Sequence, residues 1–141
     1  MSLKKMKLKS NNIDEYYKLS YELGIPKNNM DQLQEKLFGI ECNFVELNAI
    51  DFKKGCYVGQ ENTARINLKN KLNKRLFAIK IIEGIIEKNE ITSIDDKEIG
   101  KLLINDRYPF AILKHKDENF NYNSELKCGS AKIKIKKPNW L

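Results

Sequence analysis

The apolar positions near the start of the chain recur at roughly helical spacing. Between residues 13 and 23, Tyr16, Tyr17, Leu19 and Leu23 would share one face of a helix. The boundaries carry acidic residues at the start, a glycine at the end and a proline beyond it: Asp14, Glu15, Gly24 and Pro26. Such residues are typical of helix ends, so the pattern predicts a helix over residues 13–23.

The pattern is less regular between residues 28 and 75. Residues 28–31 are predicted to form a loop, and residues 32–47 are ambiguous, with a short apolar stretch around Phe44. Residues 61–67 fit a short helix, and residues 70–74 are polar and turn-like.

The second half of the chain has a strand-like pattern. Its apolar runs are short, rich in β-branched and aromatic residues, and separated by Gly, Asn and Asp; they cover residues 76–82, 85–94, 99–104, 110–114 and 132–136. Residues 131–136 alternate strictly, which predicts a strand with one wet face. Several short strands at such spacing indicate a small antiparallel barrel or sandwich. We therefore expect one part over residues 4–68 and a β-rich part over residues 72–141.

Charge and composition narrow the classes of partner. The 141 residues fit one domain or two small ones, and the net charge of +7 favours anionic partners such as nucleic acid, anionic lipid or a polycarboxylate. Lys is spread along the whole chain, however, rather than clustered. No apolar run approaches the roughly 18 residues of a membrane span, so we expect a cytoplasmic protein without a membrane partner.

Three cysteines, Cys42, Cys56 and Cys128, stand far apart in the sequence. No CxxC pair or Cys/His cluster is present, so we expect free thiols and no metal site. Cys42 and Cys128 are expected to act as small apolar residues. His115, the single histidine, is expected at the surface.

The most informative stretch is KGCYVGQE at residues 54–61. Its members are Lys54, Gly55, Cys56, Tyr57, Val58, Gly59, Gln60 and Glu61. Glycines four residues apart permit backbone geometry that other residues resist and let a ligand approach closely. Lys53, Lys54 and Arg65 would favour the thiolate of Cys56 and so its reactivity. The residues alone leave open whether Cys56 is a reactive thiol or a buried residue in a glycine-bounded turn.

This motif resembles the signature of YgfZ-type folate-binding proteins, relatives of the glycine-cleavage T-protein that include mitochondrial iron–sulfur assembly factors. The flanking residues resemble that family as well, and the resemblance covers roughly residues 14–141; it is carried by residues 24–26, 47–54, 65, 73–76 and 138–140.

The resemblance implies an α+β fold, in which a partial T-protein-like folate-binding domain is followed by a small antiparallel β-barrel. It also implies tetrahydrofolate as the ligand, iron–sulfur proteins as clients, and Cys56 as a functional thiol near the folate. The amino-terminal half of the family, which supplies much of the folate pocket, is not among these residues. We therefore expect a truncated chain, with folate bound by the full-length protein rather than by this piece alone.

Further site residues follow from the same resemblance. Glu22 matches the T-protein glutamate that contacts the pterin ring, although Ser20 stands where arginine is usual. Tyr57 is a candidate to stack on the ligand, and Lys54 and Arg65 to face its acidic tail; each of these residues has a purely structural alternative. Gln60 and Glu61 are expected to cap the following helix, where an acidic residue is favourable in any case.

Three functions remain open at this point. The first is an accessory factor for iron–sulfur protein maturation or repair. The second is an enzyme, a tetrahydrofolate-dependent aminomethyltransferase like the T-protein, which lacks the cysteine motif. The third is an RNA-binding factor of tRNA modification, suggested by the positive charge.

Overall fold

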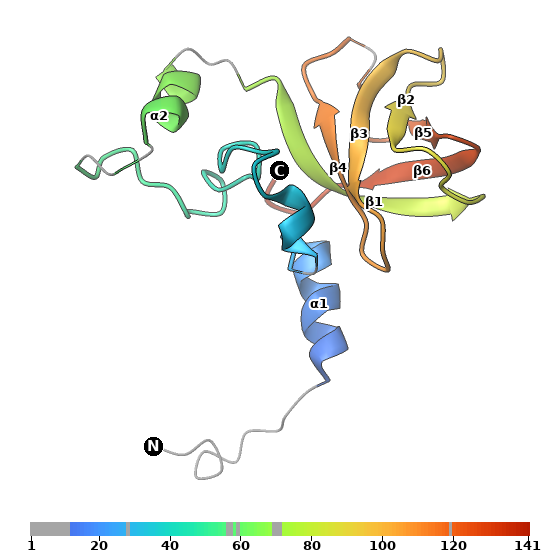
Figure 1. Ribbon diagram of the computed structural model, residues 1–141, viewed down its shortest axis with the longest axis horizontal. Coiled ribbons are helices and arrows are strands. Elements are labelled where there is room, and N and C mark those ends of the chain that lie inside the picture. The colour runs from blue at the N-terminus through green and yellow to red at the C-terminus, as the bar shows by residue number, and fades with distance from the viewer. Residues whose placement is uncertain (1–11, 28, 56–57, 59, 69–71, 119) are drawn as a thin grey trace.

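A computed structural model of the protein describes residues 12–27, 29–55, 58, 60–68, 72–118 and 120–141. It shows a six-stranded barrel and, before it in sequence, two helices joined by a long run of turns (Figure 1). The elements are α1 (Ile13–Glu22), the 3-10 helix η2 (Met30–Leu33), α2 (Gln60–Leu68), β1 (Lys74–Glu83), β2 (Glu90–Thr92), β3 (Glu98–Ile104), β4 (Phe110–Lys114), β5 (Glu125–Cys128) and β6 (Ala131–Lys136).

The α1 helix confirms the prediction made for residues 13–23. The side chain of Asn12 accepts a hydrogen bond from the backbone N–H of Asp14 at 3.1 Å, so it caps the helix start. Gly24 follows the helix with a φ of +71°, a conformation that other residues adopt at a cost. Several contacts tie α1 and its end to the rest of the chain. The Tyr21 hydroxyl donates to the Ile79 carbonyl, Arg107 Nη1 lies 2.7 Å from Asp14 Oδ1, and Trp140 Nε1 donates to the Leu23 carbonyl at 2.9 Å.

The barrel confirms the predicted antiparallel β-rich half. Its strands close in the order β1-β4-β3-β2-β5-β6, and every neighbouring pair is antiparallel. The strict alternation of residues 131–136 appears in β6, where Ala131, Ile133 and Ile135 are buried and the lysines between them are not. Closure removes sheet edges that would otherwise pair with other chains.

Strand β1 separates two hydrophobic cores. Phe77 and Ile79 point into the barrel, where they pack with residues such as Ile91 and Leu113. Leu76 and Ala78 point outward and form a second core, whose buried members are Leu33, Leu76, Ala78, Ile104 and Phe110. Five consecutive residues of β1 are therefore buried, as in a strand covered on both faces.

Some sequence predictions were wrong in detail. Residues 28–31, predicted as a loop, overlap η2, and only Glu90–Thr92 of the predicted run 85–94 forms a strand. Strand β5 was not predicted. Residues 34–55 contain no regular helix or strand, and Glu35, Asn43 and Asn48 have positive φ there. The α+β class is observed, whereas a T-protein-like domain is not established by these turns.

Candidate functional site

The described flanks of the KGCYVGQE motif are exposed. Cys56, Tyr57 and Gly59, as well as the side chain of Gln60, lie outside the described residues. Lys53, Lys54 and Gly55 are exposed, and Val58 is fully exposed. No atom lies within 4 Å of the position that a Cβ on Gly55 would take. The motif therefore begins in an open loop before α2, away from the barrel (Figure 1).

Lys54 borders a hollow of about 490 Å³ at the end of this loop. The hollow is lined by Gly39, Phe44, Ala49, Ile50, Asp51, Lys54 and Thr63. The Lys53 backbone N–H donates to Asp51 Oδ1 at 2.8 Å and so fixes the turn before the motif. Glu61 lies exposed in the first turn of α2, where a negative charge is favourable to the helix dipole, and Arg65 is exposed further along the helix.

Glu22 lies at the last turn of α1 and is exposed. Its nearest charged partner is Lys136 of β6, with Nζ 3.5 Å from Oε1. Ser20 is buried, and its hydroxyl donates to the Tyr16 carbonyl at 2.9 Å. The structure thus separates a buried position 20 from a solvent-facing carboxylate at position 22.

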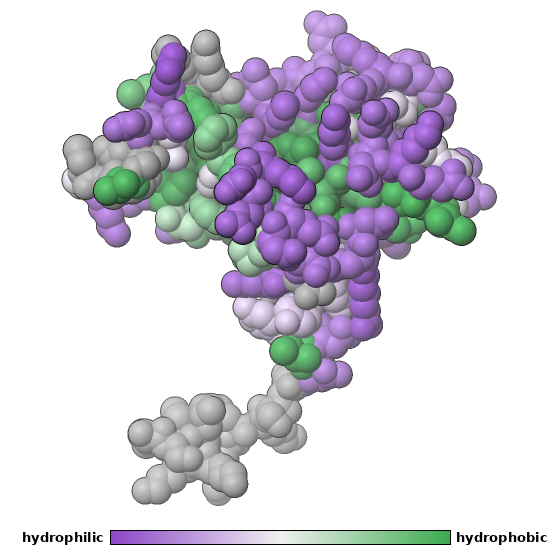
Figure 2. Space-filling model, viewed as in Figure 1, coloured by the Kyte–Doolittle hydropathy of each residue, from purple (hydrophilic) through white to green (hydrophobic). Residues whose placement is uncertain are grey.

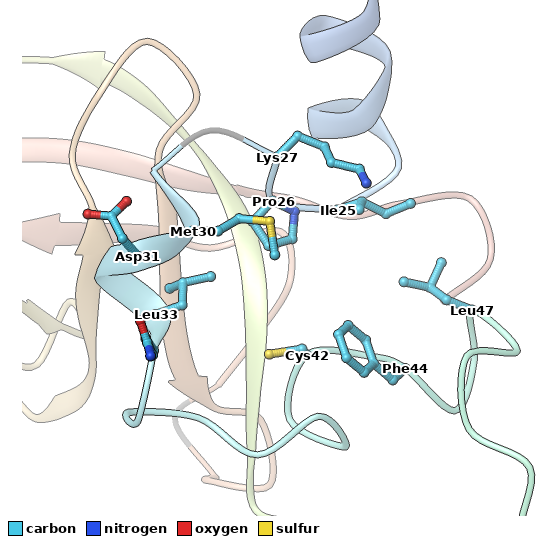
Figure 3. A pocket seen from close by; sticks show the side chains of 10 residues that line it. Ile25, Pro26, Lys27, Met30, Asp31, Leu33, Cys42, Phe44 and Leu47 are labelled. Carbon is cyan, nitrogen blue, oxygen red and sulfur yellow. The ribbon is translucent and has the colours of Figure 1, made fainter.

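A larger pocket lies between residues 25–34 and residues 42–47, and sequence reasoning did not find it (Figure 3). It has a volume of about 620 Å³ and is lined by Ile25, Pro26, Lys27, Met30, Asp31, Leu33, Gln34, Cys42, Phe44 and Leu47. The sequence signal for one wall was the short apolar stretch around Phe44, and it could not show which other segment this stretch faces. We call it the 25–47 pocket.

Two of the cysteines are shielded, as expected for small apolar residues. Cys42 lines the 25–47 pocket, and its burial, with the neighbouring charge of Glu41, raises the pKa of the thiol to about 11. Cys128 is buried in the barrel, where Sγ donates to the Lys88 carbonyl at 3.1 Å and burial also raises its pKa. Both thiols are poor nucleophiles near neutral pH because the thiolate is the reactive form.

A buried polar cluster joins the segment that leads to the motif to strand β1. Arg75 Nη1 lies 2.6 Å from Glu46 Oε1 and donates to Asn43 Oδ1 at 3.1 Å. Asn43 Nδ2 in turn donates to the Leu76 carbonyl at 2.9 Å, and the Leu76 backbone N–H donates to the Glu41 carbonyl at 2.8 Å. We call Asn43, Glu46 and Arg75 the Arg75 cluster.

His115 lies close to the Arg75 cluster and is half-buried, not at the surface as expected. Burial, followed by the charges of Arg75 and Lys116, lowers the pKa of its imidazole. Three buried atoms here have no hydrogen-bond partner among the described protein atoms: Glu46 Oε2, Arg75 Nε and His115 Nδ1. A cavity of about 190 Å³ is bordered by Glu46, Arg75 and Asn67 among apolar residues, and it is large enough to hold water beside the Glu46 and Arg75 side chains.

Within the described ranges, no three His, Cys, Asp or Glu side chains gather in a group that could hold a metal ion. None of the helices that the structure describes is long and apolar enough to cross a membrane.

The chain is homologous to iron–sulfur cluster assembly factors. It is 39% identical to the mitochondrial factor IBA57 of Mus musculus over 69 residues, or 49% of this chain. It is 29% identical to that of Homo sapiens over 92 residues, or 62% of this chain. The mitochondrial IBA57 homologue of Yarrowia lipolytica is 30% identical over 94 residues, or 67% of this chain. No family model matches the chain.

The matched region is a small part of each relative. It spans 19%, 26% and 20% of the mouse, human and yeast proteins, respectively. These relatives are named as mitochondrial, and a cytoplasmic location for this chain stays a prediction. The matches agree with the resemblance at the level of iron–sulfur assembly factors, and they do not test folate binding or the motif itself.

Proposed function

We propose that the chain is part of a folate-binding accessory factor that supports iron–sulfur protein maturation, with Cys56 as its functional thiol. The observation that carries this proposal is the homology to iron–sulfur cluster assembly factors, one of them 39% identical over 69 residues. The cluster is cargo of the client proteins in this proposal, and the chain itself holds none.

The surroundings of the motif support Cys56 as the functional thiol. Residues 53–55 and Val58 are exposed on both sides of it, so a client protein can reach this loop. Lys53 and Lys54 supply positive charge that favours a thiolate. Burial raises the pKa of Cys42 and of Cys128, which leaves Cys56 as the candidate for thiol chemistry.

The polar candidate residues fit tetrahydrofolate chemically. A pterin ring presents adjacent N–H donors that suit a carboxylate, and Glu22 offers an exposed one whose contact with Lys136, at 3.5 Å, is long and solvated. Lys54, on the 490 Å³ hollow, and the exposed Arg65 suit the acidic tail of a folate. Tyr57 is proposed to stack on its rings. Since the chain matches only a fifth to a quarter of its relatives, we propose this binding for the full-length protein.

The thiol role is tested by complementation with the full-length protein in cells that lack it. Cys56→Ser should abolish the recovery of iron–sulfur enzyme activity, whereas the matched variant Cys42→Ser should preserve it. Equal recovery by both variants would refute a thiol role for Cys56.

The ligand is tested by calorimetric titration of tetrahydrofolate into the full-length protein. Glu22→Gln keeps the size of the side chain but removes the charge, so it should weaken binding by about tenfold, as expected for a charged hydrogen-bonded pair. Absence of binding to the unmodified protein would remove folate from the proposal. Turnover of an aminomethylated lipoyl carrier would instead assign an aminomethyltransferase.

A further inference from the structure

We propose that the 25–47 pocket binds a small aromatic carboxylate. The proposal rests on the size, lining and charge of this pocket, and it stands apart from the folate proposed above. Phe44 lines both this pocket and the hollow beside Lys54, whereas Lys27 lines only this pocket and neither Glu22 nor Lys54 lines it. Variants at Lys27, Glu22 and Lys54 therefore distinguish failure of one site from failure of the other.

The pocket has the size and lining of a small-molecule site. Its volume of about 620 Å³ falls within the roughly 300–1,000 Å³ typical of ligand pockets. Met30 is 51% exposed and Phe44 is 38% exposed, although both are large apolar side chains. In Figure 3, Met30 lies above Cys42, Leu33 lies to the left of both, and Phe44 lies beside Cys42. A ligand in this space would cover apolar surface that water now reaches.

The walls of the pocket are held in place without a ligand. Leu33 is buried in the second core, which lies outside the barrel against β1, and Cys42 packs against the same core. On the other side, the Ile25 backbone N–H donates to the Ser20 carbonyl at 2.8 Å, and Pro26 is buried. A preformed pocket loses little conformational entropy when it binds a ligand.

The lining favours an aromatic ring that carries a negative charge. Met30, Pro26 and Phe44 offer a thioether and two rings, which contact aromatic ligands favourably. Lys27 lies along one wall, beside Ile25 and Pro26, whereas the Asp31 carboxylate points away from Cys42 and Phe44 (Figure 3). A carboxylate at the Lys27 end would pair with its ammonium group.

The test compares 2-naphthoate with its neutral isostere, 2-naphthamide, by calorimetric titration into the 141-residue chain. We expect 2-naphthoate to bind about three- to fivefold more tightly, the advantage of one partly exposed ion pair. Lys27→Met should remove this preference and leave 2-naphthamide binding unchanged. Phe44→Ala should weaken both ligands, whereas Ile94→Ala, at an exposed residue outside the pocket, should weaken neither.

A second readout does not depend on the folding of these variants. In a Cys56→Ser chain at pH 9, bound 2-naphthoate should slow the alkylation of Cys42, measured as mass increase with time, because that thiol lines the pocket. Lack of 2-naphthoate binding, equal affinity for the two naphthalenes, or unprotected Cys42 would each overturn the proposal. The same holds if Ile94→Ala weakens binding as much as Phe44→Ala, since binding would then not be confined to this pocket.

Discussion

Removing the positive charge of the Arg75 cluster should strongly destabilise the protein. Arg75 is only 8% exposed, and its side chain bonds Glu46 at 2.6 Å and Asn43 at 3.1 Å. Arg75→Met keeps much of the side-chain volume but leaves the Glu46 carboxylate and Asn43 Oδ1 without this donor. Loss of one partner of a buried ion pair costs about 3–5 kcal/mol. The side chain of Glu46 is 28% exposed and can recover some hydration, so we expect a loss of about 2–4 kcal/mol in the free energy of unfolding.

The assay is urea unfolding followed by circular dichroism for Arg75→Met, Glu46→Gln and the double variant. Because the two side chains contact each other, the double variant should lose less stability than the sum of the single variants, by about 1 kcal/mol or more. Lys132→Met, which breaks the exposed Lys132–Glu83 pair, serves as the matched control and should lose no measurable stability. A loss below about 1 kcal/mol for Arg75→Met, or strict additivity with Glu46→Gln, would refute the reasoning.

Three further outcomes follow from the structure. Because the pKa of His115 is lowered from 6.5 in the folded state, the unfolded state binds the proton more tightly; stability should fall as pH drops below about 6.5 towards the folded pKa, and urea titrations between pH 5 and 8 should show a weaker pH dependence for His115→Gln. Alkylation of Cys42 in a Cys56→Ser chain should be slow at pH 7 and accelerate towards pH 11, and a rate that is flat with pH would contradict its raised pKa. A Cβ at Gly100 would lie 2.2 Å from the Ile112 carbonyl oxygen, so Gly100→Ala should cost at least about 2 kcal/mol in thermal unfolding, and an unchanged midpoint would contradict this contact.

The sequence predicted those elements in which one face meets the core and the other meets water, or whose ends are marked by local residues. Residues 131–136 alternate strictly because one face of β6 meets the barrel core and the other meets water. The α1 helix was predictable because its acidic first turn, Gly24 and Pro26 mark its ends locally, whereas the cap by Asn12 emerged only from the structure. In the run 85–94, by contrast, Ile85 and Ile94 are exposed and lie outside the strands. Their hydrophobicity therefore predicted strand residues that the structure does not contain at these positions.

Of the two candidate sites, the sequence predicted one and not the other. The motif was visible because its residues are contiguous, and the structure adds that its described flanks are exposed. The 25–47 pocket was not predictable, since its walls are turns that depend on residues such as Asn29 and Asn43 in left-handed conformations. The ion pair of Glu46 with Arg75 joins segments that no periodic pattern relates.

Strand β1 has a consequence for how substitutions act on the motif. Its alternate side chains belong to different cores, so the turns before the motif and the barrel share a single wall. Loss of either core would remove support from the other, and the two should melt together in one transition. Packing against the barrel thus stabilises the segment that leads to residues 54–61. A substitution deep inside the barrel, such as Phe77→Ala, should therefore also destabilise the segment that carries the motif, although Phe77 itself contacts no ligand or client.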